Sequence, residues 1–307
     1  NDGGTFRVDG GNNRAFTSIG LVSAALFSDI DTDGDPDLIL AMEWGPIRVF
    51  ENDGGQFSDA TAARGLAGYS GRWNGVATGD LNGDGLMDIV ATNWGRNLGL
   101  RVDAARPLRV YFNDFDNNGT LDVVTAKFDE RLEAMSPLAS FRELALAMPF
   151  LQRRISNFAA YADASVQDVI GPALAHASTL DVTTLEHMLF LNRGDRFEAR
   201  ALPWEAQLAP SFYVGVADFD GDGNEDVFLT QNFFATRIDA ERHDAGRGLW
   251  LRGDGTGSLA AVAGQESGVT VYGEQRGAAL ADYNGDGRVD LALSQNGAET
   301  ILYRNER

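Results

Sequence analysis

One nine-residue pattern occurs five times in this chain, and it constrains the fold more than any other feature of the sequence. The pattern is Asp-x-Asp/Asn-x-Asp/Asn-Gly-x-x-Asp, and its copies occupy residues 29–37, 80–88, 114–122, 218–226 and 282–290. Chance does not produce five such copies in one chain of 307 residues. A chain with this repetition is expected to use one supersecondary unit many times over.

Each copy has the composition of a loop that binds a hard cation. Carboxylate or amide oxygens alternate at positions 1, 3 and 5, and glycine at position 6 permits the turn that aims the position-7 carbonyl inward. A loop this rich in carboxylates suits Ca²⁺ better than Mg²⁺, and zinc would require His or Cys. We therefore expect about five Ca²⁺ ions, one for each loop. The predicted ligands are Asp29, Asp31, Asp33, Asp35, Asp37, Asp80, Asn82, Asp84, Leu86, Asp88, Asp114, Asp116, Asn118, Thr120, Asp122, Asp218, Asp220, Asp222, Asn224, Asp226, Asp282, Asn284, Asp286, Arg288 and Asp290.

The flanking residues favour strands and exclude EF-hands. An EF-hand needs Glu at position 12 and flanking helices, whereas position 12 is Leu, Ala or Thr in all five copies. Short apolar runs of β type precede and follow every loop, so each unit is expected to read strand, loop, strand. A third strand that ends in a polar turn is expected at residues 47–57 and 189–197, with weaker copies at 249–255 and 301–305.

These loops and the Asn-x-Gly-x-Phe type of turn resemble FG-GAP/VCBS repeats, the β-propeller units of integrin α-chains and many bacterial surface proteins. Residues 98–305 resemble more narrowly the bacterial relatives of the cartilage acidic protein family, which have a helical insertion after the third loop and a stretch similar to Tyr272–Arg276. The resemblance implies an all-β fold, a β-propeller of FG-GAP/VCBS blades that radial repetition protects from open sheet edges. Five loop units predict five blades, and six or seven remain open.

The expected domain organisation is a single propeller over residues 1–307 with a helical insertion at 137–179 in the third repeat unit. Within the insertion, Phe141, Leu144 and Met148 fall at helical spacing, and helices are expected near 138–148, 149–160 and 164–170. Residues 1–6 repeat the turn after Asn52, and residues 301–305 supply the strand that should precede such a turn. We therefore expect the two ends to pair in one blade and close the ring.

The net charge of −20 has its main source in the loops themselves. Acidic composition disfavours nucleic acid as a partner, because that binding depends on clustered Lys and Arg. The three histidines do not converge with carboxylates, and no Gly-x-Ser-x-Gly elbow occurs, so an enzyme is not expected. The predicted function is an extracellular binding or adhesion module. The alternatives are a polysaccharide-active enzyme on a propeller scaffold and a purely structural module of a larger surface protein.

A ligand face is expected at the strand ends opposite the loops, where aromatic side chains stand beside amides and charges. Such mixtures suit carbohydrate or protein ligands with both polar and apolar surfaces. Capping of strand ends and packing between blades would select the same residue types, and this alternative stays open. The candidate residues are Trp44, Arg72, Trp73, Asn93, Trp94, Asn232, Glu274, Gln275, Arg276 and Asn296.

Localisation is expected to be secreted or at the cell surface, either extracellular or periplasmic. Cysteine is absent, and bound calcium can replace disulfides as a staple in such proteins. No apolar run reaches the roughly 18 residues that a membrane-spanning helix needs. Residues 1–4 do not resemble a signal peptide, so a targeting segment is expected to lie outside this chain.

Overall fold

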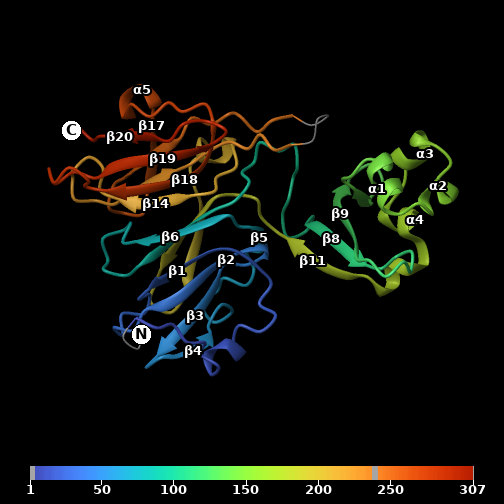
Figure 1. Ribbon diagram of the computed structural model, residues 1–307, viewed down its shortest axis with the longest axis horizontal. Coiled ribbons are helices and arrows are strands. Elements are labelled where there is room, and N and C mark those ends of the chain that lie inside the picture. Colours follow the sequence, from blue (N-terminus) through green and yellow to red (C-terminus); the bar gives the residue numbers. More distant parts are fainter. Residues whose placement is uncertain (1–3, 237–240, 307) are drawn as a thin grey trace. The chain divides into compact units, whose positions relative to one another are not determined.

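The computed structural model describes residues 4–236 and 241–306, which form short antiparallel strands and a few short helices (Figure 1). The chain divides into two compact units. The main unit comprises the residues up to Gly99 and those from Leu185 onward, and the inserted unit comprises Leu100–Thr184. Among the described residues, no helix has the length and apolar character needed to cross a membrane.

Four antiparallel sheets make up the main unit, and in each of them a nine-residue loop joins the first two strands. The sheets are numbered by their loops, so the main unit holds the first, second, fourth and fifth, and the inserted unit holds the third. The first sheet contains β1 (Leu21–Ser28), β2 (Asp37–Gly45), β3 (Arg48–Asp53), β4 (Gln56–Asp59) and β5 (Gly71–Arg72). The second contains β6 (Gly75–Gly79), β7 (Asp88–Thr92), β12 (Met188–Asn192) and β13 (Phe197–Ala201). The fourth contains β14 (Val214–Ala217), β15 (Asp226–Leu229), β16 (Leu249–Gly253) and β17 (Leu259–Val262), and the fifth β18 (Glu274–Ala281), β19 (Asp290–Asn296) and β20 (Ile301–Tyr303).

The second sheet corrects one expectation about the repeats. The expected strand and turn at 189–197 follow the third loop and its insertion in the sequence, but β12 pairs with β7 of the second sheet, with Phe190 opposite Ile89. The backbone N–H of Asn192 donates to the Asp88 carboxylate at 2.7 Å, which fixes this strand beside the second loop. The inserted unit therefore interrupts the second sheet between its second and third strands.

The inserted unit holds the third sheet and a group of short helices. The sheet has the order β10 (Ala134–Pro137), β9 (Asp122–Asp129), β8 (Leu108–Asn113) and β11 (Ser178–Val182). The helices are α1 (Phe141–Ala147), α2 (Leu151–Arg154), α3 (Phe158–Ala162), α4 (Val166–Ile170) and the 3₁₀ helix η2 (Gly171–His176). The unit begins at Leu100 and includes the third loop, and its helices lie at 141–176.

Local sequence explains where these helices begin and end. Ser140 and Ser165 each form a capping box with the acidic residue three positions later, which satisfies N–H groups that the first turn leaves free. One helix was expected over 149–160, but the chain is extended at Ile155 and a new helix begins after Asn157, whose side chain caps it. Apolar side chains of α1, α2 and α4 pack on the sheet in one cluster that includes Leu144, Met148, Leu151, Val169, Tyr111 and Val124.

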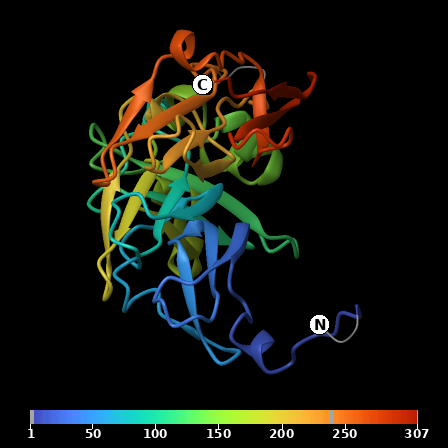
Figure 2. The same cartoon turned by 90° about the vertical axis from the view of Figure 1, so that its left-hand side faces the viewer.

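Ring closure of the expected kind is not seen among the described residues. Residues 1–3 of the expected pairing lie outside them, and β20 pairs with β19 alone. Within the main unit, the first sheet and the fifth sheet lie at opposite ends (Figures 1 and 2). The remaining helices of the unit are η1 (Asn12–Arg14), η3 (Ala206–Leu208) and α5 (Gly264–Ser267).

A fully buried histidine links β12 to the end of β7. The Nδ1 atom of His187 accepts the backbone N–H of Asn93 at 2.8 Å, so the ring proton is on Nε2, which donates to the carbonyl of Ala209 at 3.0 Å. Burial lowers the pKa of His187 to about 4, because a charged ring would lose its water and its bond from Asn93.

Replacement of residues 100–184 by a short Gly-Ser linker should leave the main unit folded. The N–H of Gly95 already donates to the carbonyl of Leu185 at 2.6 Å, so the two ends of the excised segment start close together. We expect a single cooperative thermal transition within a few degrees of that of the main unit in the intact chain. A deletion protein that is unfolded by circular dichroism would contradict the assignment of β12 to the second sheet.

Stability should fall as pH drops through the range in which His187 would be protonated. The pKa of His187 is about 4 in the folded state against an ordinary 6.5. Between these values the unfolded state binds a proton that the folded state does not, so the free energy of unfolding is highest above pH 6.5 and falls toward pH 4. The loss amounts to about 3 kcal/mol at most, from the difference in pKa. Urea unfolding at several pH values should show this slope in the wild type and in His176→Gln, an exposed control, but not in His187→Gln. Equal slopes in all three proteins would contradict the assignment.

Candidate functional site

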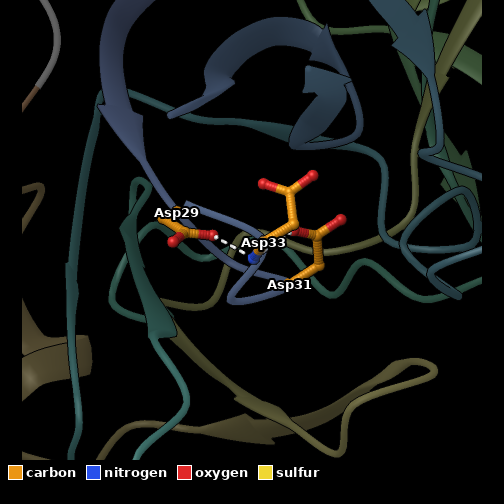
Figure 3. Close-up of side chains that lie close together, drawn as sticks. All are labelled: Asp29, Asp31 and Asp33. Carbon is orange, nitrogen blue, oxygen red and sulfur yellow. Dashed lines mark hydrogen bonds between the residues drawn. The ribbon is translucent and has the colours of Figure 1, made fainter. Parts of the chain in front are cut away.

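All five loops share one pattern of hydrogen bonds from backbone to carboxylate. In the first loop, one oxygen of Asp29 accepts the N–H of Asp33 at 3.2 Å (Figure 3). The other oxygen accepts the N–H of Gly34 at 3.0 Å. Gly34 has φ +94, a conformation that a residue with a Cβ rarely adopts. The same two bonds recur at Asp80, Asp114, Asp218 and Asp282. The sequence therefore folds each repeat into the same compact turn.

The ninth residue of each loop joins the loop to the sheet. One oxygen of Asp37 accepts the N–H of Ile30 inside the loop and the other accepts the N–H of Asn52 at the end of β3, both at 2.9 Å. Asp88, Asp226 and Asp290 make the equivalent pair of bonds in the second, fourth and fifth sheets. In the third sheet, Asp122 accepts from Phe115 in the same way.

Carboxylates of the loops, including several that accept these bonds, gather closely enough to hold a metal ion. In three loops the acidic ligand atoms lie within 4.8 Å of one another. These groups are Asp29, Asp31 and Asp33 (Figure 3), then Asp114, Asp116 and Asp122, and finally Asp218, Asp220 and Asp226. The second and fifth loops have an amide at position 3, Asn82 and Asn284, so the carboxylate of that position is missing from them. An all-oxygen donor set of this kind fits a hard divalent cation.

Position 7 contributes in a different way from positions 1, 3 and 5. The N–H of Asp35 donates to the Asp33 carboxylate at 2.8 Å, and the equivalent bond forms at Leu86, Thr120, Asn224 and Arg288. The Asp35 side chain accepts the N–H of Gly54 at 2.8 Å, and this bond stabilises the turn between β3 and β4. Only the backbone carbonyl of these residues remains a predicted ligand.

The electrostatics of the loops favour a bound cation. Burial raises the pKa of Asp88 to about 6, and the neighbouring carboxylates of Asp84 and Asp80 add to the effect. Burial together with nearby carboxylates likewise raises the pKa of Asp31, Asp37, Asp122 and Asp226. A divalent cation would relieve this repulsion, because it stabilises the ionised form of every carboxylate around it.

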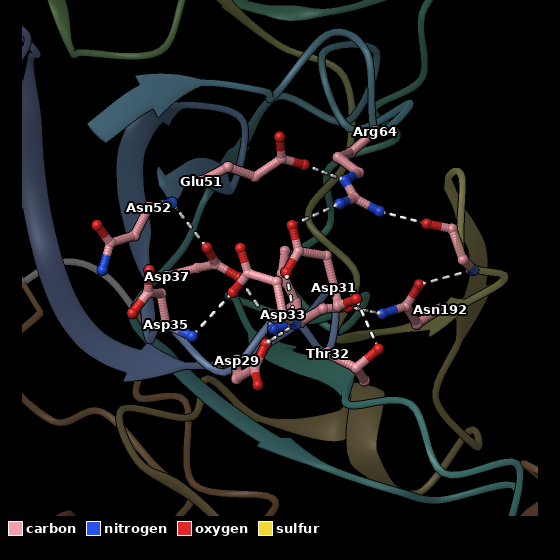
Figure 4. Close-up of polar contacts among 12 residues, drawn as sticks. Asp29, Asp31, Thr32, Asp33, Asp35, Asp37, Glu51, Asn52, Arg64 and Asn192 are labelled. Atoms are coloured by element: carbon pink, nitrogen blue, oxygen red, sulfur yellow. Dashed lines mark hydrogen bonds and ion pairs between the residues drawn. The ribbon is translucent and has the colours of Figure 1, made fainter. Parts of the chain in front are cut away.

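Arginines supply part of that counter-charge at three loops. Arg64 lies 3.6 Å from Asp31 and also pairs with Glu51 at 2.5 Å, beside the first loop (Figure 4). Arg252 contacts Asp220 at 2.7 Å, and Arg288 contacts Asp286 at 2.8 Å. At the fifth loop the hydrogen bond from Arg288 lowers the pKa of Asp286 despite burial. The loops are therefore not equivalent, and the fifth combines an arginine with an amide at position 3.

Five of the ten candidate ligand residues at the other strand ends are buried and pack or cap the sheets. Trp73 is 0% exposed and meets the ring of Phe190 edge-on in the core of the first two sheets. The buried amide of Asn232 donates to the carbonyls of Gly246 and Gly273. Asn93, Glu274 and Gln275 are also buried. The capping alternative, left open by the sequence, therefore describes these five side chains.

Four of the other five candidates form a half-buried cluster with three further aromatic residues, and its members come from the strand ends of all four sheets of the main unit. The Arg72 guanidinium lies 4.4 Å from the ring centre of Trp94 and 5.7 Å from that of Trp44. The Arg276 guanidinium lies 3.9 Å from the ring centre of Phe212. Edge-on contacts join Trp94 to Phe212, Phe233 and His243. We call these seven residues, Trp44, Arg72, Trp94, Phe212, Phe233, His243 and Arg276, the arginine–aromatic cluster.

The cluster lies at the strand ends away from the loops and is electrically balanced. In the first sheet, Ser28 and Asp37 face each other at the loop end and Leu21 and Glu43 at the other end, next to Trp44. Glu43 pairs with Arg72 at 2.5 Å, and Glu274 pairs with Arg276. Asn296 is exposed and donates to Glu274 at 3.0 Å.

Phe212, Phe233 and His243 were missing from the predicted set. Phe233 could have been found by its register, since it lies seven residues after Asp226 as Trp44 lies seven residues after Asp37. His243 reaches the cluster through an isolated bridge with Phe233, a contact that no local pattern predicts. Burial lowers the pKa of His243, which favours the neutral ring.

Backbone strain accompanies the cluster. Trp44 has φ +66 and Asn232, next to Phe233, has φ +83. A bulky residue in the left-handed region is unfavourable by about 1–3 kcal/mol, and such residues gather at sites where the structure needs a side chain in one particular place. At Trp44 this conformation holds the indole beside Arg72.

Comparison with known proteins supports the repeat assignment. Residues 29–91, which include the first two loops, match the family model of the FG-GAP-like repeat. Human cartilage acidic protein 1 is 32% identical over 123 residues, which cover 38% of this chain and 17% of the human protein. The match therefore spans only a small part of that relative.

Two solved structures have much weaker similarity. A lectin of Agrocybe aegerita that recognises non-reducing terminal N-acetylglucosamine is 18% identical, with a TM-score of 0.22 over 93% of this chain and 81% of its own. The biofilm matrix protein Bap1 of V. cholerae is 11% identical, with a TM-score of 0.28 over 93% of this chain and 63% of its own. Neither likeness contributes to the argument at these TM-scores. What the comparisons support is an all-β chain that contains FG-GAP-like repeats.

Proposed function

We propose that this chain is a calcium-stabilised extracellular β-propeller module that binds a carbohydrate or protein partner through the arginine–aromatic cluster. The observation that carries the binding role is the convergence of four sheets on two arginines stacked on aromatic rings. The observation that supports the calcium role is the recurrence of one carboxylate-lined turn in all five sheets.

Calcium is the proposed ion because every side-chain donor in the loops is an oxygen. Ca²⁺ accepts six to eight oxygen ligands in flexible geometry, whereas Mg²⁺ demands a near-ideal octahedron and retains water. Oxygens at positions 1, 3 and 5 would hold the ion, and the ninth Asp would add a carboxylate to this set while it ties the loop to the sheet. Bound there, the cation would supply positive charge and geometric constraint, with no catalytic step.

The proposed role of the ion is structural, because the loops make the contacts between neighbouring sheets. The Asn192 amide of the second sheet donates to the carbonyl of Ile30 in the first loop at 2.7 Å, beside Arg64 and Asp31 (Figure 4). A loop that opened through carboxylate repulsion would lose this contact as well as its own turn. Loss of metal is therefore expected to destabilise several sheets together.

Removal of Ca²⁺ should lower the thermal unfolding temperature of the whole main unit. A ligand that binds only the folded state adds about 2.7 kcal/mol per site at a hundredfold excess over its dissociation constant. Unfolding followed by circular dichroism with excess Ca²⁺ and then with chelator should show a large decrease. Mg²⁺ added back after chelation is the control and should restore less stability than Ca²⁺. Identical transitions under all conditions would contradict the calcium proposal. The proposed binding role of the arginine–aromatic cluster would not be affected by that result.

The cluster suits a neutral polar ligand with apolar faces. Glu43 and Glu274 balance the charges of Arg72 and Arg276, and the partly exposed Glu43 offers a carboxylate acceptor beside the guanidinium donors. Aromatic faces beside such groups match a sugar ring, which has hydroxyls at its edge and C–H groups on its faces. The same surface would accept an Arg- or Tyr-rich segment of a protein, so binding to glycans and binding to proteins are both outcomes of the test below.

Substitution in the cluster should weaken binding without unfolding the chain. The experiment screens a glycan array and an extracellular-protein panel, and then measures affinity for each hit by calorimetry. Arg72→Ala and Arg276→Ala should each lower affinity at least tenfold, equivalent to about 1.4 kcal/mol, because each removes a stacked cation and its hydrogen bonds.

The matched control is Trp204→Ala, since Trp204 is 58% exposed and lies outside the cluster. It should bind as the wild type does. Folded arginine variants that bind every hit with wild-type affinity would exclude the cluster as the binding site. Turnover of a polysaccharide by the wild type, lost in the same variants, would favour the enzyme alternative over a binding module.

A further inference from the structure

Five asparagines of this chain are each followed by glycine, the sequence in which an asparagine side chain loses its amide most readily. Glycine favours the reaction because it has no Cβ to shield its backbone nitrogen. All five pairs lie among the described residues. They are Asn74–Gly75, Asn82–Gly83, Asn118–Gly119, Asn284–Gly285 and Asn296–Gly297.

The reaction at such a pair needs only water and the atoms of the chain. The backbone nitrogen of the glycine attacks Cγ of the asparagine, and Nδ2 leaves as ammonia after it takes up the proton that the glycine nitrogen loses. Water then opens the resulting succinimide ring and leaves aspartate or isoaspartate. A hydrogen bond from the glycine N–H or from the asparagine Nδ2 slows the reaction, because it must be broken before the attack or before the departure of ammonia.

Three of the five pairs are held by one of these two contacts. Asn74 Nδ2 donates to two backbone carbonyls, at 3.1 and 3.0 Å. Asn296 Nδ2 donates to the Glu274 carboxylate at 3.0 Å. At the third pair the glycine is held, since the N–H of Gly119 donates to Asp114 at 2.9 Å.

The pair in the fifth loop is held by both contacts. The N–H of Gly285 donates to the Asp282 carboxylate at 2.7 Å. Asn284 Nδ2 donates to the Asp286 carboxylate at 3.1 Å. This pair occupies positions 3 and 4 of its loop, so it is the direct counterpart of Asn82–Gly83 in the second loop.

The pair in the second loop has neither contact. Gly83 is exposed, and its N–H makes no hydrogen bond within the described part of the chain. The Nδ2 atom of Asn82 is buried and has no hydrogen-bond partner there either. The nucleophile of the reaction is therefore open to solvent, and no hydrogen bond retains the leaving group.

The acceptor side of the Asn82 amide is already in place for the attack. Its Oδ1 atom accepts the N–H of Asp84 at 3.0 Å. Negative charge develops on this oxygen when Cγ is attacked, and an N–H that points at it stabilises that charge. The equivalent bond forms between Asp286 and Asn284 at 2.9 Å, so the two loops differ in the contacts that oppose the reaction and not in this one.

The packing of the fourth sheet explains why Nδ2 of Asn82 is isolated. The carbonyl of Leu81 accepts the N–H of Gly257 at 2.9 Å, which brings a turn of the fourth sheet onto the second loop. A Cβ atom at Gly257 would lie only 3.5 Å from Cβ of Asn82. Asn82 therefore lies at the junction of the two sheets.

We propose that Asn82 is a site of spontaneous deamidation in the folded chain and reacts before the other four asparagines. The aspartate product places a carboxylate at position 3 of the second loop, as in the first, third and fourth loops. The isoaspartate product adds a methylene group to the main chain beside the junction with the fourth sheet. This inference does not depend on the proposed function, because the reaction requires neither a bound cation nor a ligand.

Peptide mapping by mass spectrometry tests the proposal on the full chain, incubated at neutral pH with excess Ca²⁺ and shown to be folded by circular dichroism. Asn82 should react about tenfold faster than Asn284, a difference of about 1.4 kcal/mol in the barrier, which is the scale of one hydrogen bond. It should also react before the asparagines of the other three pairs. In the chain unfolded by urea, all five should react at similar rates, because glycine follows each of them.

The matched control is Asn82→Gln, because attack on the longer side chain forms a less favourable ring. This variant should lack the earliest acidic species that ion-exchange chromatography separates from the wild type, and the other four rates should not change. A folded wild type in which Asn82 reacts no faster than Asn284 overturns the proposal. The same order of rates in the unfolded chain also overturns it, since sequence alone would then explain the difference. So does a folded chain in which Asn82 stays intact while the unfolded chain reacts.

Discussion

The ninth carboxylate of each loop is the contact on which the sheets of the main unit depend. Asp37, Asp88, Asp226 and Asp290 each use one oxygen for the loop and the other for the third strand. One carboxylate therefore fixes the turn between the first two strands and the position of the third. A buried carboxylate without N–H donors is strongly unfavourable. Asp88 therefore holds the N–H of Asn192, although the whole inserted unit separates the two residues in the sequence.

This arrangement concentrates negative charge where the sheets meet. The pKa of Asp88 is raised because burial removes its water and because the carboxylates of Asp84 and Asp80 repel its charge. The fold must offset both effects. Backbone N–H groups offset part of it, and arginines such as Arg64 and Arg252 offset more at particular loops. The acidity of the chain follows from this architecture, so it carries little information about a partner. A divalent cation would offset the charge that remains in each loop.

The local parts of this structure could be predicted from the sequence and the long-range parts could not. Each loop is closed by bonds between residues at most seven positions apart, so its pattern is complete within nine letters. The third strand of the second sheet begins at Met188, far from Asp88, and no local pattern assigns it. Composition likewise placed Trp73 and Arg72 in one candidate face. Trp73 is buried in a core that includes Phe190, which comes from the other side of the insertion. The family resemblance implied a closed ring, but closure depends on surfaces at both ends of the described chain.

The loops and the arginine–aromatic cluster occupy opposite ends of the same strands, which couples them mechanically. β2 runs from Asp37 at the first loop to Trp44 in the cluster, and β18 runs from Arg276 in the cluster toward the fifth loop. A strand is stiff over this length, and its register fixes one end relative to the other. Rings and guanidinium groups that come from different sheets stay stacked only while those sheets keep their spacing, and the loop carbonyls help to set that spacing. A binding face assembled from four sheets therefore needs rigid junctions more than it needs any single side chain.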